Sequence, residues 1–98
     1  MGDEVILRKR ASHWRGVLTE SGHLFLDSKR IVFMPDRFDI QGERLEIALE
    51  DITEIVKMDI GLSKEMHLKL KDGRRERFVV SGRDEFADAL TRQMAHKQ

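Results

Sequence analysis

The chain has 98 residues, and its 18 Lys and Arg side chains balance 18 Asp and Glu side chains, so its formal net charge is zero. This length predicts one small domain spanning residues 1–98. The neutral balance argues against a general nucleic-acid coat protein, which is usually basic. The absence of cysteine excludes disulfides, thiol nucleophiles and thiolate metal sites.

The sequence also bears on the cellular compartment. Acidic residues precede the first short apolar run, which is the wrong order for a signal peptide. No apolar stretch approaches the ~20 residues that a bilayer-spanning helix needs. These features predict a cytoplasmic protein.

Short strands are expected at the start of the chain. Residues 4–10 form a candidate opening strand in which Val5 and Leu7 face inward. Residues 11–15 continue this strand or form a loop, and residues 16–20 form a second short strand. Each apolar run is too short for a helix, which favours strands.

Residues 21–22 are expected to turn the chain into a hairpin that is the centre of the predicted fold. Two apolar runs, 24–26 and 31–34, flank the polar turn 27–30. Because side chains alternate along a strand, the hairpin has two faces. One face pairs Leu24 with Phe33 and Leu26 with Ile31, and the other pairs Phe25 with Val32 and His23 with Met34.

Period-two alternation continues beyond this hairpin. Residues 45–50 alternate between inward apolar and outward side chains, and residues 52–58 are expected to form the next strand because β-branched residues dominate. Residues 66–71 and 77–81 are two further strands. The Asp-Gly pair at 72–73 joins them and favours a tight hairpin, because both residues tolerate positive φ.

The final segment changes to a helical period. Ser81 is the expected N-cap, and acidic residues follow it in the first turn. Phe86, Leu90 and Met94 then recur every four residues. This spacing predicts an amphipathic helix over residues 82–96.

This order of about seven strands and one C-terminal helix resembles the pleckstrin-homology-like superfold and, within it, the GRAM-type domains. The family's G-x-L-x-L-T-x-x-R-L-x-F pattern is matched by Gly22, Leu24, Leu26, Arg30, Ile31 and Phe33, with Asp27 in place of the threonine. Later elements of the family are matched by Ile47, Leu49, Asp51 and Ile52 and by Asp72, Gly73, Phe78 and Val80. The resemblance implies a mainly β sandwich or barrel of two nearly orthogonal antiparallel sheets, with the helix capping one open end. It implies no single function, because the superfold hosts lipid binders, peptide binders and structural domains.

A basic N-terminal segment is the first candidate site. The resemblance implies that basic residues of the first two strands and their loop hold lipid phosphates, as in pleckstrin-homology domains that bind phosphoinositides. Cations bind phosphate through charge-assisted hydrogen bonds, and a Trp is suited to the headgroup interface. The alternative is an exposed edge strand whose charges discourage aggregation. The candidate residues are Arg8, Lys9, Arg10, Trp14 and Arg15.

A second basic cluster surrounds the turn at residues 72–73. The favoured interpretation is a solvated sheet face whose charge Glu65 and Glu76 partly compensate. No aromatic residues interleave with these cations, so no nucleic-acid partner is expected. The cluster comprises Lys69, Lys71, Arg74, Arg75 and Arg77.

The second face of the central hairpin is a candidate protein interface. If the first face fills the core, Phe25, Val32 and Met34 face outward, and an exposed apolar patch marks an interface. The alternative is that the loop 36–41, which contains Phe38 and Ile40, folds over them. Under the interface hypothesis, the chain self-associates or docks to a protein partner.

Nothing in the sequence argues for catalysis or for a cofactor. The four histidines, His13, His23, His67 and His96, have no zinc-site spacing, and the acids between residues 36 and 43 lack the calcium-loop pattern. The sequence therefore predicts a small non-enzymatic GRAM/PH-like binding or assembly module that acts through protein–protein contacts. Peripheral binding to anionic phospholipid or phosphoinositide membranes is the alternative.

Overall fold

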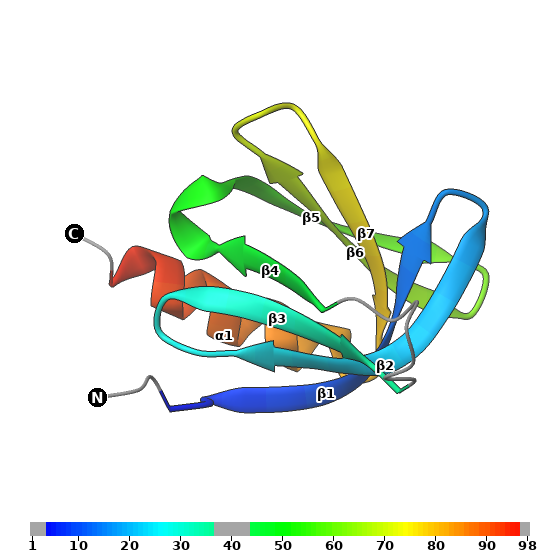
Figure 1. The fold of residues 1–98 in the computed structure, drawn as a ribbon, viewed down its shortest axis with the longest axis horizontal. Coiled ribbons are helices and arrows are strands. Elements are labelled where there is room, and N and C mark those ends of the chain that lie inside the picture. The colour runs from blue at the N-terminus through cyan, green and yellow to red at the C-terminus, as the bar shows by residue number, and fades with distance from the viewer. Residues whose placement is uncertain (1–3, 37–43, 97–98) are drawn as a thin grey trace.

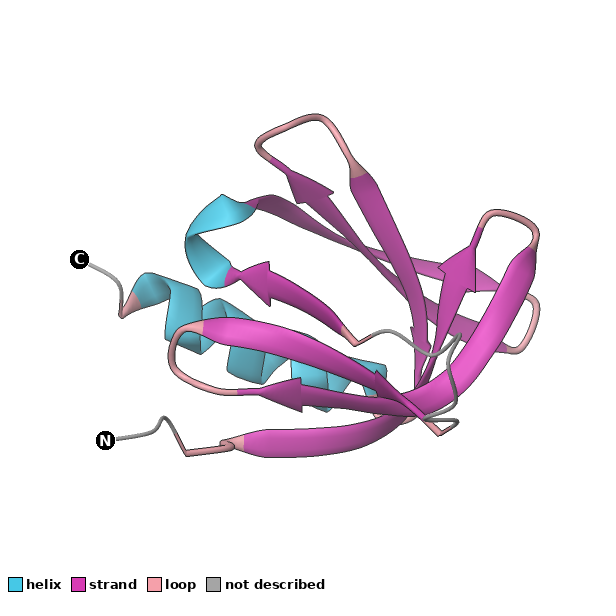
Figure 2. Ribbon diagram, viewed as in Figure 1, coloured by secondary structure: helices cyan, strands magenta, loops and turns pink. Residues whose placement is uncertain are grey.

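The computed structural model describes residues 4–36 and 44–96, which form seven strands followed by one α-helix (Figures 1 and 2). The 3₁₀ turn η1 (Leu49–Asp51) joins the fourth strand to the fifth, and the helix is α1 (Arg83–Ala95). The strands are β1 (Leu7–Arg15), β2 (Leu18–Leu26), β3 (Arg30–Pro35), β4 (Leu45–Ala48), β5 (Ile52–Ile60), β6 (Ser63–Leu70) and β7 (Arg75–Val80).

All seven strands belong to one antiparallel sheet in the order β4-β3-β2-β1-β7-β6-β5. The sheet curls so that its β1–β4 half faces its β5–β7 half, as Figure 1 shows. Strand β1 belongs to both halves, because it pairs with β2 along its whole length and with β7 over residues 11–13. The expected mainly β architecture with a C-terminal helix is confirmed, but the two implied sheets are one continuous sheet.

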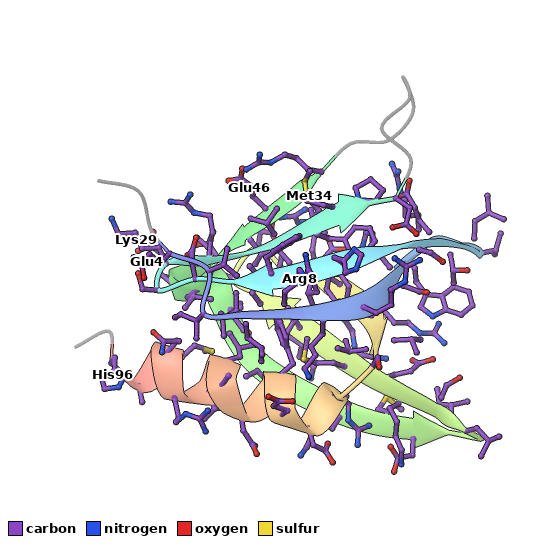
Figure 3. The ribbon with its side chains drawn as sticks, turned by 90° about the horizontal axis from the view of Figure 1, so that it is seen from below. Glu4, Arg8, Lys29, Met34, Glu46 and His96 are labelled. Atoms are coloured by element: carbon purple, nitrogen blue, oxygen red, sulfur yellow. The ribbon has the colours of Figure 1, made fainter. Side chains whose placement is uncertain are left out.

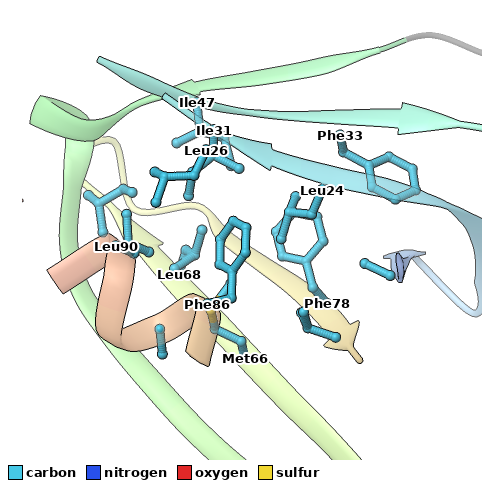
Figure 4. Close-up of a cluster of buried hydrophobic side chains, with 14 of the residues drawn as sticks. Leu24, Leu26, Ile31, Phe33, Ile47, Met66, Leu68, Phe78, Phe86 and Leu90 are labelled. Atoms are coloured by element: carbon cyan, nitrogen blue, oxygen red, sulfur yellow. The ribbon is translucent and has the colours of Figure 1, made fainter. Parts of the chain in front are cut away.

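The core lies between the two halves of the sheet and α1. Phe86 and Leu90 of α1 point into the same cluster as Leu24 and Leu26 of β2 (Figure 4). The helix thereby covers the apolar surface that the curled sheet leaves open, because an amphipathic helix must bury its apolar stripe. The largest fully buried side chains are Phe33, Phe78, Phe86, Leu24, Leu26, Ile31, Leu49, Met66, Leu68, Leu90 and Val80. No helix in the described part of the chain is long and apolar enough to cross a membrane.

The register of β2 with β3 is the one that the hairpin pattern predicts. Leu24 lies opposite Phe33 and Leu26 opposite Ile31, and all four side chains are at most 1% exposed. The intervening side chains point away from the core, because successive residues of a strand face opposite sides. Phe25 pairs with Val32 and His23 with Met34 on that outer side.

The first two strands are longer than predicted. Residues 11–15 continue β1, and β2 runs through Ser21 and Gly22 without a turn. The chain instead turns at Gly16, whose φ is 67°. Gly22 is required for a different reason: a Cβ atom there would lie 2.1 Å from the carbonyl oxygen of Met34. The glycine therefore permits close approach of two strands.

Two local expectations are wrong. Val5 is 56% exposed and lies before β1, whereas Leu7 packs against the core as expected. Ser81 does not cap α1: its backbone N–H donates to the carbonyl oxygen of Arg10, so Ser81 still follows the sheet. The N-cap is Gly82, whose φ of 74° turns the chain from β7 into the helix.

Replacing Gly22 by Ala is expected to lower the free energy of unfolding by about 1–3 kcal/mol, because the new methyl group collides with a backbone carbonyl rather than with a movable side chain. Urea denaturation followed by Trp fluorescence measures this. Gly61→Asn is the matched control, since Gly61 sits in an open turn with φ 61° that Asn tolerates. Equal losses in the two variants would contradict the close-approach role of Gly22.

Candidate functional site

The first four strands present an outer face with an apolar centre and charged flanks. Arg8 of β1 lies opposite Phe25 of β2, Phe25 opposite Val32 of β3, and Val32 opposite Glu46 of β4. These four residues form one row across the strands, and Figure 3 labels Arg8, Met34 and Glu46 in this part of the sheet. We define the β1–β4 outer face as this row together with its outward neighbours Ile6, Arg10, His23, Arg30, Met34 and Ala48.

The apolar centre of this face is partly open to solvent. Phe25, Val32 and Met34 are half-buried, which places them between the fully covered core residues and a freely exposed patch. The alternative cover, the loop 36–41, lies outside the described residues except for Asp36. The interface role of the three side chains therefore stays a prediction, supported by their outward direction.

The basic residues of β1 do not converge on one point. Arg8 and Arg10 lie on the β1–β4 outer face, where Arg8 has no acidic partner among the described residues. Arg10 Nη1 donates to Asp36 Oδ1 at 2.8 Å, and this hydrogen bond lowers the pKa of Asp36. Lys9 points to the opposite side of β1, where its Nζ lies 2.6 Å from the Glu85 carboxylate of α1.

The other two members of the predicted lipid site lie farther along β1. Arg15 Nη1 donates to Glu20 Oε1 at 3.2 Å across the β1–β2 hairpin. The Trp14 ring lies 4.2 Å from the guanidinium carbon of Arg77, a cation–π contact with β7. The indole N–H of Trp14 is buried without a hydrogen-bond partner in the described part of the chain. The structure thus divides the predicted lipid-binding residues among four surroundings.

The outer face of the β5–β7 half is held by a buried charge network. Glu65 is 2% exposed and accepts hydrogen bonds from Arg77 at 2.7 and 2.9 Å and from His67 Nε2 at 2.9 Å. Arg75 Nε donates to His67 Nδ1 at 3.1 Å, so His67 carries its proton on Nε2. The hydrogen bonds from Arg77, with that from His67, lower the pKa of Glu65 to about 2 against the opposing effect of burial.

The second basic cluster is compensated, as its favoured interpretation predicted. Lys69 Nζ lies 3.1 Å from Glu54, and Arg74 Nε donates to Asp72 at 2.7 Å. Arg77 is bound by the buried carboxylate of Glu65. Acids therefore neutralise much of this surface, and only Lys71 among its cations has no side-chain partner in the described part of the chain.

One acid and one histidine lie where the sequence pattern did not place them. Glu76 was expected on the solvated face, but it points inward and its Oε1 lies 2.8 Å from His13 Nε2. The hydrogen bond from His13 lowers the pKa of Glu76. The His13 ring stacks on Phe78 at 4.9 Å between centroids, so this pair belongs to the core. The described residues contain no group of three or more side chains arranged to hold a metal ion.

Two hairpin tips carry exposed apolar side chains that the sequence reasoning did not single out. Val17 and Leu18 at the β1–β2 tip are 88% and 71% exposed, and Leu62 at the β5–β6 tip is 100% exposed. Each tip follows a glycine with positive φ, Gly16 or Gly61. The available signal was an apolar residue directly after a turn glycine, where polar residues are usual.

Comparison with known proteins identifies the fold. No protein-family model matches the chain, and no curated protein matches it. Among solved structures, the N-terminal PH domain of Vps36 superimposes with a TM-score of 0.81 at 21% identity, covering 96% of this chain and 80% of that one. The chain has the pleckstrin-homology-like fold. The C-terminal domain of an unknown protein from Leishmania infantum is similar, with a TM-score of 0.83 at 16% identity, covering 96% of this chain and 86% of that one.

The two superpositions establish the PH-like fold, but identities this low carry no site from either structure to this chain. The seven-stranded curled sheet and its helix are therefore those of a PH-like fold. The GRAM-type assignment rests on the sequence resemblance alone. Any function of the PH-like domain must be inferred from its own surface.

Replacing Glu65 by Gln is expected to lower the free energy of unfolding by about 3 kcal/mol at neutral pH, because Arg77 then loses its buried carboxylate. The folded-state pKa of about 2 lies below the usual 4.5, so the native protein is stabilised above about pH 4.5 and loses this contribution as pH falls toward 2.

Urea unfolding measured from pH 2 to pH 7 tests both effects. Between pH 2 and about pH 4.5, the free energy of unfolding of the Glu65→Gln variant should depend less on pH than that of the wild type. Glu54→Gln, which removes an exposed acid at the sheet edge, is the control and should change stability by less than about 1 kcal/mol. If the free energy of unfolding of Glu65→Gln depended on acidic pH as strongly as that of the wild type, the structural role of the buried pair would be contradicted.

Proposed function

We propose that this PH-like domain is a non-enzymatic binding or assembly module that docks protein through the β1–β4 outer face. The observation that carries the proposal is the cross-strand pair Phe25–Val32, which leaves apolar surface half-open beside Met34. Burying such surface against a partner is favourable, at roughly 25 cal/mol per Å² of apolar area. The sequence resemblance supports placing the domain among the GRAM-type modules, and its composition supports a cytoplasmic location.

The contrast between the two halves of the sheet supports this choice of face. On the β5–β7 half, Glu65, His67 and Arg77 satisfy one another, so a partner would gain little by covering them. On the β1–β4 half, Phe25 and Val32 have no comparable cover from described side chains. The β1–β4 outer face therefore offers apolar surface whose burial by a partner would favour association.

A non-enzymatic role agrees with the way buried titratable groups are engaged. Glu65 is held by Arg77 and His67, and Glu76 is held by His13, each within hydrogen-bonding distance. Groups fixed in structural pairs are poorly placed to exchange protons with a substrate. These contacts support the interpretation of the domain as a binding scaffold.

Anionic membrane binding through Arg8, Lys9, Arg10, Trp14 and Arg15 is the second candidate. Arg8 supports it, because this cation has no acidic partner among the described residues and lies beside Phe25. The carboxylates that hold Lys9, Arg10 and Arg15 weaken it, because a lipid phosphate would have to replace them. Protein docking is therefore the function that the surface supports best.

Replacing Val32 by Arg is expected to abolish protein binding, because it places a charge at the centre of the apolar patch. The measurement is a pull-down in which the immobilised domain retains proteins from a cell extract. Proteins that the wild-type domain retains should be lost with the Val32→Arg variant. Val56→Arg is the matched control, since Val56 is a half-buried valine of β5 beside His67 on the other half. Retention of the same proteins by Val32→Arg would contradict the proposed face.

Vesicle sedimentation separates the membrane alternative from protein docking. With vesicles of phosphatidylcholine, phosphatidylserine and a phosphoinositide, we expect no sedimentation that depends on Arg8 and Arg10. Binding that weakens at high salt and is lost in the Arg8→Glu/Arg10→Glu double variant would instead establish the membrane role, because salt screens exposed charges over a Debye length of about 10 Å at 0.1 M.

A further inference from the structure

The central row of the β1–β4 outer face has opposite charges at its two ends. Arg8 stands on β1 at one end and Glu46 on β4 at the other, and Phe25 and Val32 lie between them. The row is continuous because each residue is the direct cross-strand partner of the next. Its order is therefore basic, apolar, apolar, acidic.

Such a row is complementary to itself under a two-fold rotation. Consider an axis parallel to the strands and lying between β2 and β3, in the plane where two copies meet. Rotation by 180° about it places β4 of the second copy over β1 of the first, and β3 over β2. Arg8 then faces Glu46 of the second copy, and Phe25 faces Val32 of the second copy.

The neighbouring residues obey the same rule. His23 is the cross-strand partner of Met34, so these two also exchange places and an imidazole faces a thioether. Ile6, 45% exposed beside the end of β2, would face Ala48 at the β4 edge. The His23–Met34 row extends the apolar centre on one side. Arg10 and Arg44 flank this row, so the rotation also brings Arg10 toward Arg44 of the second copy.

Arg10 and Arg44 already have carboxylate partners, which offset the repulsion between them. Arg10 is bonded to Asp36, and Arg44 is bonded to Glu46. Glu46 retains acceptor positions for Arg8 of the second copy, because a carboxylate offers about four lone-pair sites. The rotation therefore gives Arg8 an acid, while Arg10 and Arg44 keep theirs.

We propose that the β1–β4 outer face binds a second copy of this chain, with Arg8 of each copy paired to Glu46 of the other. The inference rests on the proposed function, because it names the occupant of the same face. Two sheets that pack face to face with nearly aligned strands are a common arrangement, and the axis described here produces it. Each dimer contains two Arg8–Glu46 contacts, as an isologous interface requires.

Charge reversal tests the pairing directly. Arg8→Glu alone sets the introduced carboxylate against that of Glu46 twice in each dimer, and Glu46→Arg alone sets Arg8 against an introduced guanidinium twice. Each variant should weaken self-association in sedimentation velocity by about tenfold or more, since two exposed attractive pairs become two repulsive ones. An equimolar mixture of the two variants should dimerise like the wild type, because the heterodimer has two opposite-charge pairs.

Lys69→Glu is the control, since it reverses a charge in the exposed Lys69–Glu54 pair on the other half and should leave dimerisation unchanged. A wild-type chain that stays monomeric at about 1 mM, or a mixture that stays dissociated, overturns the inference. Such a monomer would still retain proteins through Val32 if the proposed function is right. Loss of that Val32-dependent retention would overturn the proposed function as well.

Discussion

The antiparallel pairing of β2 with β3 divides this chain into core and surface. A slip of one residue would move Leu24 and Phe33 to the outside and bring Phe25 and Val32 inward, because side chains alternate along each strand. Full burial of each large apolar side chain contributes about 1.5–3 kcal/mol, so a slip would forfeit several such contributions together. The close approach of Gly22 to the Met34 carbonyl fixes the same register at the other end of the hairpin.

The two halves of the curled sheet then acquire different surfaces. On β6 and β7, Glu65 and Arg77 meet across neighbouring strands, and the Glu65 carboxylate is removed from water. Separating such a pair is costly, since a buried charge needs its partner, and this face is consequently fixed. On β2 and β3 the corresponding outward positions hold Phe25 and Val32, whose contacts with solvent can still be exchanged for contacts with a protein.

Much of this arrangement was predictable from local pattern. Strand alternation alone located the core side of residues 22–35, and helical spacing placed Phe86 and Leu90. The uninterrupted course of β2 was not predictable, because the need for Gly22 arises from a strand that follows later in the chain. The alignment of Arg8 with Glu46 was also inaccessible, since it depends on three successive strand pairings. Local patterns therefore indicated the faces, and only the assembled sheet revealed their charge order.

The charge order matters more for orientation than for affinity. The Phe25–Val32 centre supplies apolar area in whatever direction a second copy lies on it. An axis perpendicular to the strands would place Arg8 against Arg8 and Glu46 against Glu46, whereas the axis parallel to them pairs Arg8 with Glu46. Like charges in contact are penalised, so the flanks select one of two orientations that the apolar centre alone would not distinguish. A row with equal charges at both ends would have no such preference, and this difference makes the order of residues across the four strands informative about assembly.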